Sequence, residues 1–455
     1  MVKYRCLKTR KGGTKKVKDN IAQNGQGCKP NEEFTGKNLT RFGGAGLVRR
    51  FFDKLHIVDH LAGLGTSKRR EEDYSAMEVC LGMLYGLMMG IFRPGHMGEL
   101  KLDKVFQKLA GMKRLPSQST ISRFLSKITV HKARHVAEIN FKLLRLIRKG
   151  FRELKAITLD LDSHVISVFG KQHRARRGYN PKKRGRPSYH PLMCFIGETR
   201  DYLGGMLRSG NRTSAYKARD FLTAILHKLP GEIAVTRLRA DSGFFSLDFL
   251  HWLLKRKIEF YMVVPQQVWL QKMILGIGNW REFDKGFAMG ELRMPIPSLK
   301  DVRLVVIREV VRKGENPRKQ LKLFSVQEDL YNYQVIATNS DAPGEEVWRF
   351  YNKRACCENF IKEGIYGFGL DKSICRSWAG ARLYFELIML AYNLMNWFKE
   401  MALGYNAKKE MAGTIRWKLF FIPAKLAVSG RKIRLRLADW WPHREEFYKA
   451  LIALT

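Results

Sequence analysis

Acidic residues are scarce in this sequence of 455 residues, and their scarcity is its first sharp feature. The chain has 42 Asp and Glu residues against 83 Lys and Arg residues, which gives a formal net charge of +41. A surplus of this size repels itself in a compact chain unless a polyanion neutralises it. Because cationic side chains that contact phosphates release condensed counterions, the composition indicates a nucleic acid as the partner.

Long hydrophobic runs are also missing. The longest apolar stretches cover residues 80–92 and 385–398, and both are shorter than the roughly 20 residues that a membrane helix needs. No apolar run follows the basic N-terminus, so we expect no secretory signal peptide. An anionic membrane surface would favour a basic amphipathic helix, and the sequence has no clear one. We therefore expect no membrane partner and interpret both apolar stretches as buried helices.

Cysteine is infrequent and lacks the spacing of a metal site. The seven cysteines include no Cys-x-x-Cys pair, and the adjacent Cys356 and Cys357 do not form a zinc motif. An odd number of scattered cysteines is typical of reduced thiols. Together with the charge, this predicts a cytoplasmic or nucleoid-associated protein.

The hydrophobic pattern changes several times along the chain and divides it into expected domains. Apolar residues recur at helical spacing up to about residue 150, and alternating strand patterns follow. We expect a flexible basic arm over residues 1–40, a helical DNA-binding domain over 41–150, the first part of an α/β catalytic core over 151–265, a β-rich insertion over 266–343, the last helices of the core over 344–403, and a basic tail over 404–455.

One helix of the N-terminal region has the features of a DNA-reading element. Pro116 and Ser117 provide helix-start chemistry, and the helix that follows carries Arg123. This segment is either the recognition helix of a helix-turn-helix unit or an ordinary capped surface helix. The pattern does not decide between the two.

Acidic side chains stand at three places that an α/β core can bring together. Asp160 and Asp162 lie near the end of a strand in KAITLDLD, Asp241 closes the later strand AVTRLRAD, and Glu358 lies on a helix after the insertion. In a ribonuclease-H-like sheet these two strands are neighbours, and the last helix packs across them. That arrangement would collect three carboxylates from distant parts of the sequence at one point.

Crowded carboxylates call for divalent cations. Unpaired carboxylates repel one another, and some of them stay protonated. Mg²⁺ prefers oxygen ligands and keeps several waters, so a few carboxylates suffice. Two such ions about 4 Å apart can activate an attacking oxygen and stabilise a leaving one. We therefore expect Mg²⁺ or Mn²⁺, as two ions, and phosphodiester hydrolysis or transesterification.

Three acidic segments carry a specific resemblance. LDLDS, RADSGFF and YNKRACCENFIKE resemble the three acidic motifs of the DDE transposases of bacterial insertion sequences, and the match is closest to family thirteen-eighty. PSQSTISRFL, GYNPKKRGRPSYHPL, LRSGN and LAYNL extend the resemblance over most of residues 75–400. The resemblance implies a ribonuclease-H-like, retroviral-integrase-like core that is interrupted by a β-rich insertion before the catalytic glutamate. It also implies that Asp241 is the second acid and Glu358 the third.

The first acid stays open between two residues. Asp160 and Asp162 share one face of their strand, so the alternation cannot choose between them. Asp162 is favoured because related families follow the catalytic aspartate with a small or hydroxyl residue, which here is Ser163. Asp160 is then a supporting residue, or else the true ligand.

The third motif resembles the Tyr-Arg-Glu-Lys signature of the wider group. Tyr351, Arg354 and Glu358 are spaced to share one face of a single helix over residues 344–364. Arg354 is expected to hold a DNA phosphate or to orient Glu358. The family's lysine would fall at Ile365, so Lys362, one turn after the glutamate, is expected to take its place.

Further DNA contacts are expected from a basic loop and from two tryptophans. Eight Lys and Arg residues and no acid lie between residues 171 and 186. Such side chains contact phosphates more than bases. The loop residues chosen as DNA ligands are Lys182, Lys183, Arg184 and Arg186. Trp269 and Trp280 are candidates for stacking on a flipped base, as an aromatic of the insertion does in related hairpin-forming enzymes, although core packing is the commoner role of tryptophan.

Cut-and-paste DNA transposition is the function that these features predict. The enzyme would bind the terminal inverted repeats of its own element, nick the DNA with water, and join a 3′-hydroxyl to target DNA. A homodimer on DNA is expected because two ends must be held together. The alternatives are an inactive DNA-binding regulator derived from a transposase and a basic protein that coats nucleic acid.

Overall fold

The computed structural model describes residues 32–65, 74–149, 156–229, 234–310, 331–372, 375–430 and 432–455. Most of the arm expected over residues 1–40 therefore lies outside the described residues. Among the helices that are described, none combines the length and the apolar character needed to cross a bilayer. The five cysteines in the described ranges are all free thiols.

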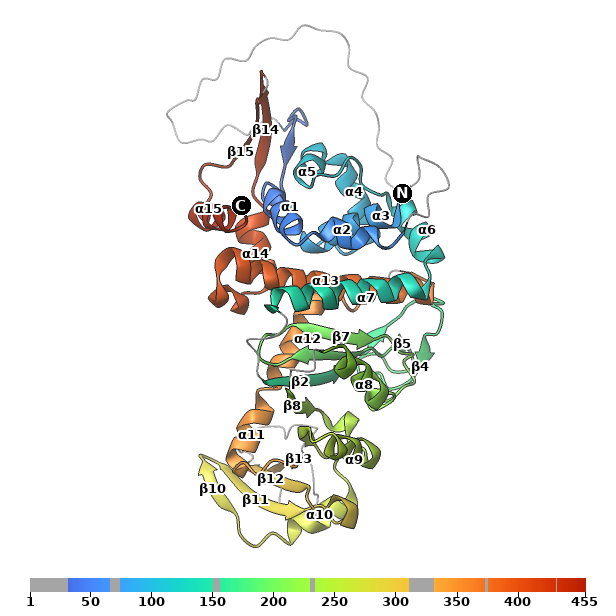
Figure 1. The fold of residues 1–455 in the computed structure, drawn as a ribbon, viewed down its shortest axis with the longest axis vertical. Helices are drawn as coiled ribbons and strands as arrows, with labels where there is room; N and C mark the ends of the chain where they lie inside the picture. The colour runs from blue at the N-terminus through green and yellow to red at the C-terminus, as the bar shows by residue number, and fades with distance from the viewer. Residues whose placement is uncertain are drawn as a thin grey trace. The chain divides into compact units, whose positions relative to one another are not determined.

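Helices fill the first part of the chain (Figure 1). Polar side chains cap the start of several of them. The seven helices are α1 (Ala45–Lys54), α2 (Ile57–Ala62), α3 (Ala76–Met88), α4 (Pro94–Glu99), α5 (Lys104–Leu109), α6 (Gln118–Lys127) and α7 (Val130–Ile147). Ser75 and Glu78 form a capping box at α3, and Ser117 caps α6 as the sequence predicts. Nearly all of α3 is buried, as expected for the apolar stretch over residues 80–92.

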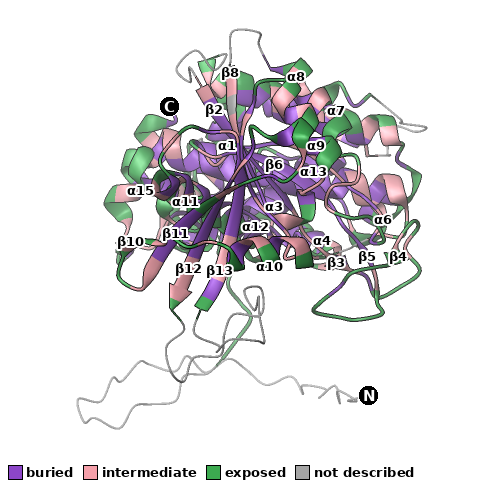
Figure 2. Ribbon diagram, turned by 90° about the horizontal axis from the view of Figure 1, so that it is seen from below, coloured by how far each residue is buried: buried purple, intermediate pink, exposed green. Residues whose placement is uncertain are grey.

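A nine-stranded mixed sheet follows in the order β10-β11-β12-β13-β9-β8-β2-β6-β7. Its first five strands along the chain are β2 (Ala156–Ser163), β6 (Leu192–Ile196), β7 (Tyr202–Met206), β8 (Ala234–Ala240) and β9 (Glu259–Val263). Strands β2, β8 and β9 run parallel, and β6 and β7 are added antiparallel at the other side of β2. Both faces of β2 are buried, including the face that carries Asp160 and Asp162. Figure 2 shows these central strands as largely buried.

The strands of the expected insertion continue this same sheet. They are β10 (Arg281–Asp284), β11 (Phe287–Arg293), β12 (Arg303–Val310) and β13 (Tyr331–Thr338). Strand β13 pairs antiparallel with β9, with Ile336 opposite Val263 and Thr338 opposite Tyr261. A helix that the sequence did not indicate, α10 (Val268–Leu275), precedes them. Residues 311–330 of this region lie outside the described ranges.

The helix expected over residues 344–364 is broken, so that expectation was wrong. The structure has two helices instead, α11 (Gly344–Asn352) and α12 (Ala355–Phe368). Tight i to i+3 hydrogen bonds join them, from Arg354 N to Tyr351 O at 2.8 Å and from Cys357 N to Arg354 O at 2.7 Å. Neither Gly nor Pro stands at the junction. The side chain of Arg354 turns from it toward the buried carboxylate of Asp162, and this tertiary contact outweighs local helix propensity.

The remaining elements support the sheet or form a separate ribbon. They are α8 (Ala218–Lys228), α9 (Leu247–Lys255), α13 (Trp378–Leu403), α14 (Ala412–Ile415) and α15 (Arg444–Ala453), the sheet β3 (Ile166–Ser167), β5 (Pro187–Tyr189) and β4 (Arg176–Arg177), and the sheet β1 (Leu39–Thr40), β14 (Ala424–Ser429) and β15 (Lys432–Leu437). Helices α7 and α13 pack together and against β7 (Figure 1). The C-terminal residues expected as a basic tail thus hold the helices α14 and α15 and a ribbon of β14 and β15.

Asn393 ties α13 to the sheet. It is fully buried, its Oδ1 accepts from Tyr202 N at 2.8 Å, and its Nδ2 donates to Tyr202 O and to Asn140 Oδ1, each at 2.8 Å. The amide therefore satisfies the backbone of β7 where that strand meets α7 and α13.

We predict that Asn393→Leu destabilises the protein by about 2–4 kcal/mol, because it leaves the Tyr202 amide N–H buried without an acceptor. Urea unfolding measures this as a lower midpoint with an unchanged slope. Asn406→Leu is the control, since Asn406 is exposed, and it should change the free energy of unfolding by less than about 0.5 kcal/mol. Equal effects of the two substitutions would contradict the role given to Asn393.

Candidate active site

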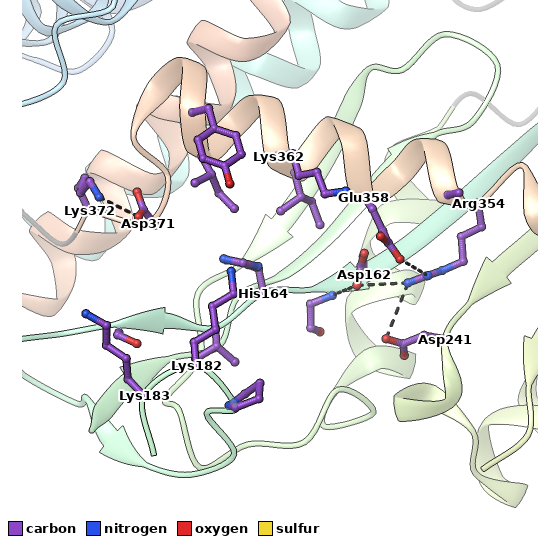
Figure 3. Close-up of a pocket in the computed structure, with 18 of the residues that line it drawn as sticks. Asp162, His164, Lys182, Lys183, Asp241, Arg354, Glu358, Lys362, Asp371 and Lys372 are labelled. Carbon is purple, nitrogen blue, oxygen red and sulfur yellow. Dashed lines mark hydrogen bonds and ion pairs between the residues drawn. The ribbon is translucent and has the colours of Figure 1, made fainter. Parts of the chain in front are cut away.

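Three carboxylates meet around one guanidinium group (Figure 3). Arg354 Nη2 lies 3.2 Å from Asp162 Oδ1 and 3.7 Å from Asp241 Oδ2. Arg354 Nη1 lies 4.0 Å from Glu358 Oε1. Residues that are about 80 to 200 positions apart in the sequence are thus within reach of one side chain.

The order of strands brings these side chains together. Strands β2 and β8 are parallel neighbours, so the residues at their carboxyl ends meet at one edge of the sheet. Asp162 lies at the end of β2, and Asp241 directly follows β8, where it accepts a hydrogen bond from Gly243 N at 2.9 Å. Glu358 stands in the first turn of α12, which packs against β2.

Asp160 has a different environment from Asp162. It is fully buried, and Arg239 of β8 binds it with two hydrogen bonds, Nε to Oδ1 at 2.6 Å and Nη2 to Oδ2 at 2.7 Å. The third nitrogen of Arg239 donates to Phe350 O at 3.0 Å. Both oxygens of Asp160 are therefore engaged by a structural partner, whereas Asp162 opens into the cavity described below.

Burial and repulsion set the charge state of Asp162. Burial raises the pKa of this carboxyl to about 6, the Arg354 guanidinium opposes the shift, and the neighbouring Asp241 and Glu358 add to it. Burial also lowers the pKa of His164 to about 4, which leaves that imidazole neutral at physiological pH. The pKa of Tyr351 rises to about 12, mainly through burial.

The carboxylates line a large cavity of about 1390 Å³ whose wall is rich in cations. The basic residues of the wall come from four separate parts of the chain. They are Arg93, His96, His164, Lys182, Lys183, Arg354, Lys362 and Lys372. Asp162, Asp241, Glu358 and Asp371 are the acidic residues of the same wall. A polyanion can therefore approach the carboxylates between positive side chains.

The structure brings part of the expected DNA-binding set to this cavity. Tyr351, Arg354, Lys362, Lys182 and Lys183 line it, and so does Ile365, which stands where the family's lysine would be. The residues that do not line it are Arg123, Arg184, Arg186, Trp269 and Trp280.

The two tryptophans are both half-buried outside the cavity wall. Trp280 packs beside Tyr333 with Arg308 over its ring, and Trp269 donates to Gln267 Oε1 at 2.5 Å. Stacking of these tryptophans on a flipped base stays a prediction, and the residues that line the cavity give it no support.

Two buried arginines near the site were not expected from the sequence. Arg239 pairs with Asp160, and its place two residues before Asp241 on the same strand face was the available signal. Arg208, in the quoted LRSGN segment, donates from Nη2 to Ser163 Oγ at 2.9 Å and from Nε to His190 O at 2.9 Å. Arg208 thereby holds Ser163, the residue next to Asp162. Nothing in the sequence indicated that this arginine would be buried, because arginine is rarely buried unless it is paired.

Comparison with known proteins now defines the family. The model of the transposase DDE domain, group 1, matches residues 23–455, which is most of the chain. The chain belongs to the DDE transposase family. No curated protein matches the sequence significantly. Among solved structures, the cryo-EM structure of a piggyBac transposase synaptic complex with hairpin DNA aligns with a TM-score of 0.44 and 15% identity, covering 84% of this chain and 80% of that chain.

The family confirms the function predicted from the acidic motifs. This DDE transposase is an enzyme of DNA transposition, a nuclease and strand transferase. Transposases of this family generally use divalent metal ions. Among the described residues, no three His, Cys, Asp or Glu side chains already stand in the geometry of a metal site. The Arg354 guanidinium occupies the space between the acids, and the all-oxygen donor set around it is of the kind that Mg²⁺ prefers.

Replacing each of the two aspartates of β2 by Asn is predicted to change the free energy of unfolding in opposite directions. Both variants are measured in EDTA, so that no metal is bound. The folded-state pKa of Asp162, about 6, lies above the unfolded value of about 3.9. Its ionisation therefore destabilises the fold progressively as the pH rises from about 4 to about 6, and the penalty is complete above that. Asp162→Asn should stabilise the protein by about 1–3 kcal/mol near pH 7 and by almost nothing near pH 4.

Asp160→Asn should instead destabilise the protein by about 3–5 kcal/mol, because Arg239 would keep a buried charge without its carboxylate. Urea unfolding at both pH values measures the two variants side by side. If both substitutions shift the free energy of unfolding in the same direction at neutral pH, the assignment of Asp160 as the structural acid and Asp162 as the open one is wrong.

Proposed function

We propose that Asp162, Asp241 and Glu358 are the catalytic and metal-binding acids of this transposase. The observation that carries the proposal is their convergence on Arg354 at the wall of a basic cavity. Asp160 is assigned a supporting role, because Arg239 engages both of its oxygens. The supporting position of Ser163 beside Asp162 agrees with the pattern of related families.

The three acids are proposed to hold Mg²⁺ or Mn²⁺, as two ions. When bound, such ions activate the attacking oxygen and stabilise the leaving oxygen of a phosphodiester. Arg354 balances the acids in their absence. Its guanidinium is close enough to bind a scissile-strand phosphate once it leaves the carboxylates, since Arg matches phosphate geometry with two parallel donors.

A ribonuclease-H-like core is proposed on the topology of the sheet. Strands β2 and β8 are parallel neighbours, β6 and β7 extend β2 antiparallel, and α12 packs across β2. The expected β-rich insertion corresponds to β10 to β13 between β9 and α11. The helices α1 to α7 are proposed as the DNA-binding domain before the core, with Arg123 on the exposed side of α6.

The substrate is proposed to be the pair of terminal inverted repeats of the enzyme's own element, together with target DNA. Lys182, Lys183 and Lys362 line the cavity and are assigned to phosphates, and Arg184 and Arg186 extend the same basic loop. Two ends must be processed together, so a homodimer on DNA is proposed. From the resemblance of its motifs, the protein is proposed to belong to insertion-sequence family thirteen-eighty, which would make it a bacterial, nucleoid-associated enzyme performing cut-and-paste transposition.

We predict that Asp241→Asn and Glu358→Gln each lower Mg²⁺-dependent cleavage of DNA bearing the element's ends by at least about a thousandfold, because each removes a metal ligand. Binding of the same DNA should weaken by less than about tenfold, since neither acid contacts phosphate directly. Gel-resolved cleavage and fluorescence anisotropy measure the two properties separately.

Asp371→Asn is the matched control for these variants. Asp371 lines the same cavity, but it pairs with Lys372 at 2.8 Å and is not among the acids around Arg354. This variant should cleave normally. If the unmodified protein binds ends but never cleaves them, the inactive-regulator alternative replaces the proposal. If the unmodified protein binds all nucleic acids alike and cleaves none, the alternative of a basic coating protein replaces the proposal.

A further inference from the structure

The C-terminal ribbon of β14 and β15 has two chemically different faces. Its register pairs Lys425 with Arg436, Ala427 with Arg434 and Ser429 with Lys432. Paired residues of antiparallel strands point to the same side, so one face presents four cations. Neither strand contains an acidic residue.

The other face fixes how the ribbon sits on the protein. It carries the pairs Ala424 with Leu437 and Leu426 with Leu435, and both Ala424 and Leu426 are 6% exposed, whereas the third pair, Val428 with Ile433, is exposed. A Cβ at Gly43, just before α1, would meet Ala424 and Leu437 within 3 Å, which shows how closely this face is packed. Because the inner part of the apolar face is packed against the rest of the protein, the basic face, whose four cations are all exposed, is turned to solvent.

The four cations are exposed and have no structural task. Lys425, Lys432, Arg434 and Arg436 make no ion pair or side-chain hydrogen bond with any residue in the described ranges. This sets them apart from the buried Arg239 and Arg354, whose charges are balanced by acids. None of the four lines the catalytic cavity.

We propose that this basic face of the ribbon is a second DNA-binding surface, which contacts the phosphates of duplex DNA outside the catalytic cavity. Cations at alternate positions of a strand are about 6.6–6.8 Å apart, which is close to two steps of about 3.4 Å along one DNA strand. The major groove of B-DNA also admits a two-stranded β-ribbon. The proposal rests on the DNA-binding part of the proposed function and adds the surface responsible.

The contact is independent of base sequence. The side chains are Lys and Arg without a neighbouring Asn, Gln or acid on the same face to read base edges. Its contribution therefore appears in the salt dependence of binding, where each phosphate contact adds about 0.9 to the slope of log K against log salt.

The test measures binding of the full chain, carrying Asp241→Asn to prevent cleavage, to a short duplex of arbitrary sequence at a series of KCl concentrations. The ribbon variant carries Lys425→Gln, Lys432→Gln, Arg434→Gln and Arg436→Gln. We expect its salt slope to fall by about 3–4 and its Kd at low salt to rise at least about tenfold. A charge-preserving variant with Lys and Arg exchanged at the four positions should keep the parent slope.

The matched control removes four exposed cations that the proposed function does not assign to DNA and whose side chains have no ion pair or hydrogen bond in the described ranges, namely Lys228, Lys255, Lys257 and Lys300, each replaced by Gln. A loss of slope equal to that of the ribbon variant would overturn the proposal, because net charge alone would explain it. An unchanged slope in the ribbon variant, with parent-like circular dichroism, would also overturn it. So would ribbon-dependent binding to vesicles of anionic lipid without ribbon-dependent binding to DNA.

The same measurements separate this inference from the proposed function. A protein that shows the ribbon-dependent slope but whose Asp241-containing form never cleaves its ends supports the ribbon surface and contradicts the proposed catalytic role. A protein that cleaves its ends but shows no ribbon-dependent slope supports the proposed catalytic role and contradicts the ribbon surface.

Discussion

The guanidinium of Arg354 is the constraint around which this active site is arranged. The carboxylate of Asp162 is buried, and the nearby charges of Asp241 and Glu358 add to burial in raising its pKa, so a counter-charge is needed beside it. Burial still holds the pKa of Asp162 near 6 with Arg354 only 3.2 Å away, which shows how strong the desolvation is. The break between α11 and α12 follows from the same demand, because it places Arg354 at the start of α12 and turns its side chain inward. A divalent cation that binds here would join carboxylates whose negative charge Arg354 already partly balances.

Strand β2 shows what a sequence can and cannot decide. The alternation of LDLDS correctly placed Asp160 and Asp162 on one face of a strand, and the order of motifs pointed to the strand of Asp241 and the helix of Glu358. The choice between the two aspartates needed a partner from another strand. Arg239 lies directly opposite Asp160 in the parallel register, and Gly197 leaves room for this pair, since a Cβ there would lie 2.6 Å from Arg239 Nη2. Such pairing depends on register, which local pattern does not contain.

Other features escaped the sequence for the same reason. The single helix expected over residues 344–364 has good local propensity, and only the distant carboxylates explain its division. Strands β10 to β13 were recognised as β-rich, but their pairing with β9 into one sheet is a long-range property. The two tryptophans of that region were identified by type alone, and neither of them lines the cavity, although Trp280 packs beside the lining residue Tyr333. Residue type alone can suggest candidate site residues, but only the tertiary contacts show which of them lie at the site.

The charge surplus of the chain divides into two populations with different physical roles. Buried arginines such as Arg208, Arg239 and Arg416 bind backbone carbonyls or acids and contribute little to the outer field. The electrostatic field around the protein comes from its exposed cations. At the candidate site this positive field has to offset the negative charge of the carboxylates. The three carboxylates proposed as catalytic repel phosphates, so their own charge would oppose the binding of DNA. Lys182, Lys183 and Lys362 on the cavity wall supply positive charge beside these carboxylates and so oppose that repulsion. A site of this chemistry therefore needs cations around its acids, and the cavity wall provides them from separate parts of the chain.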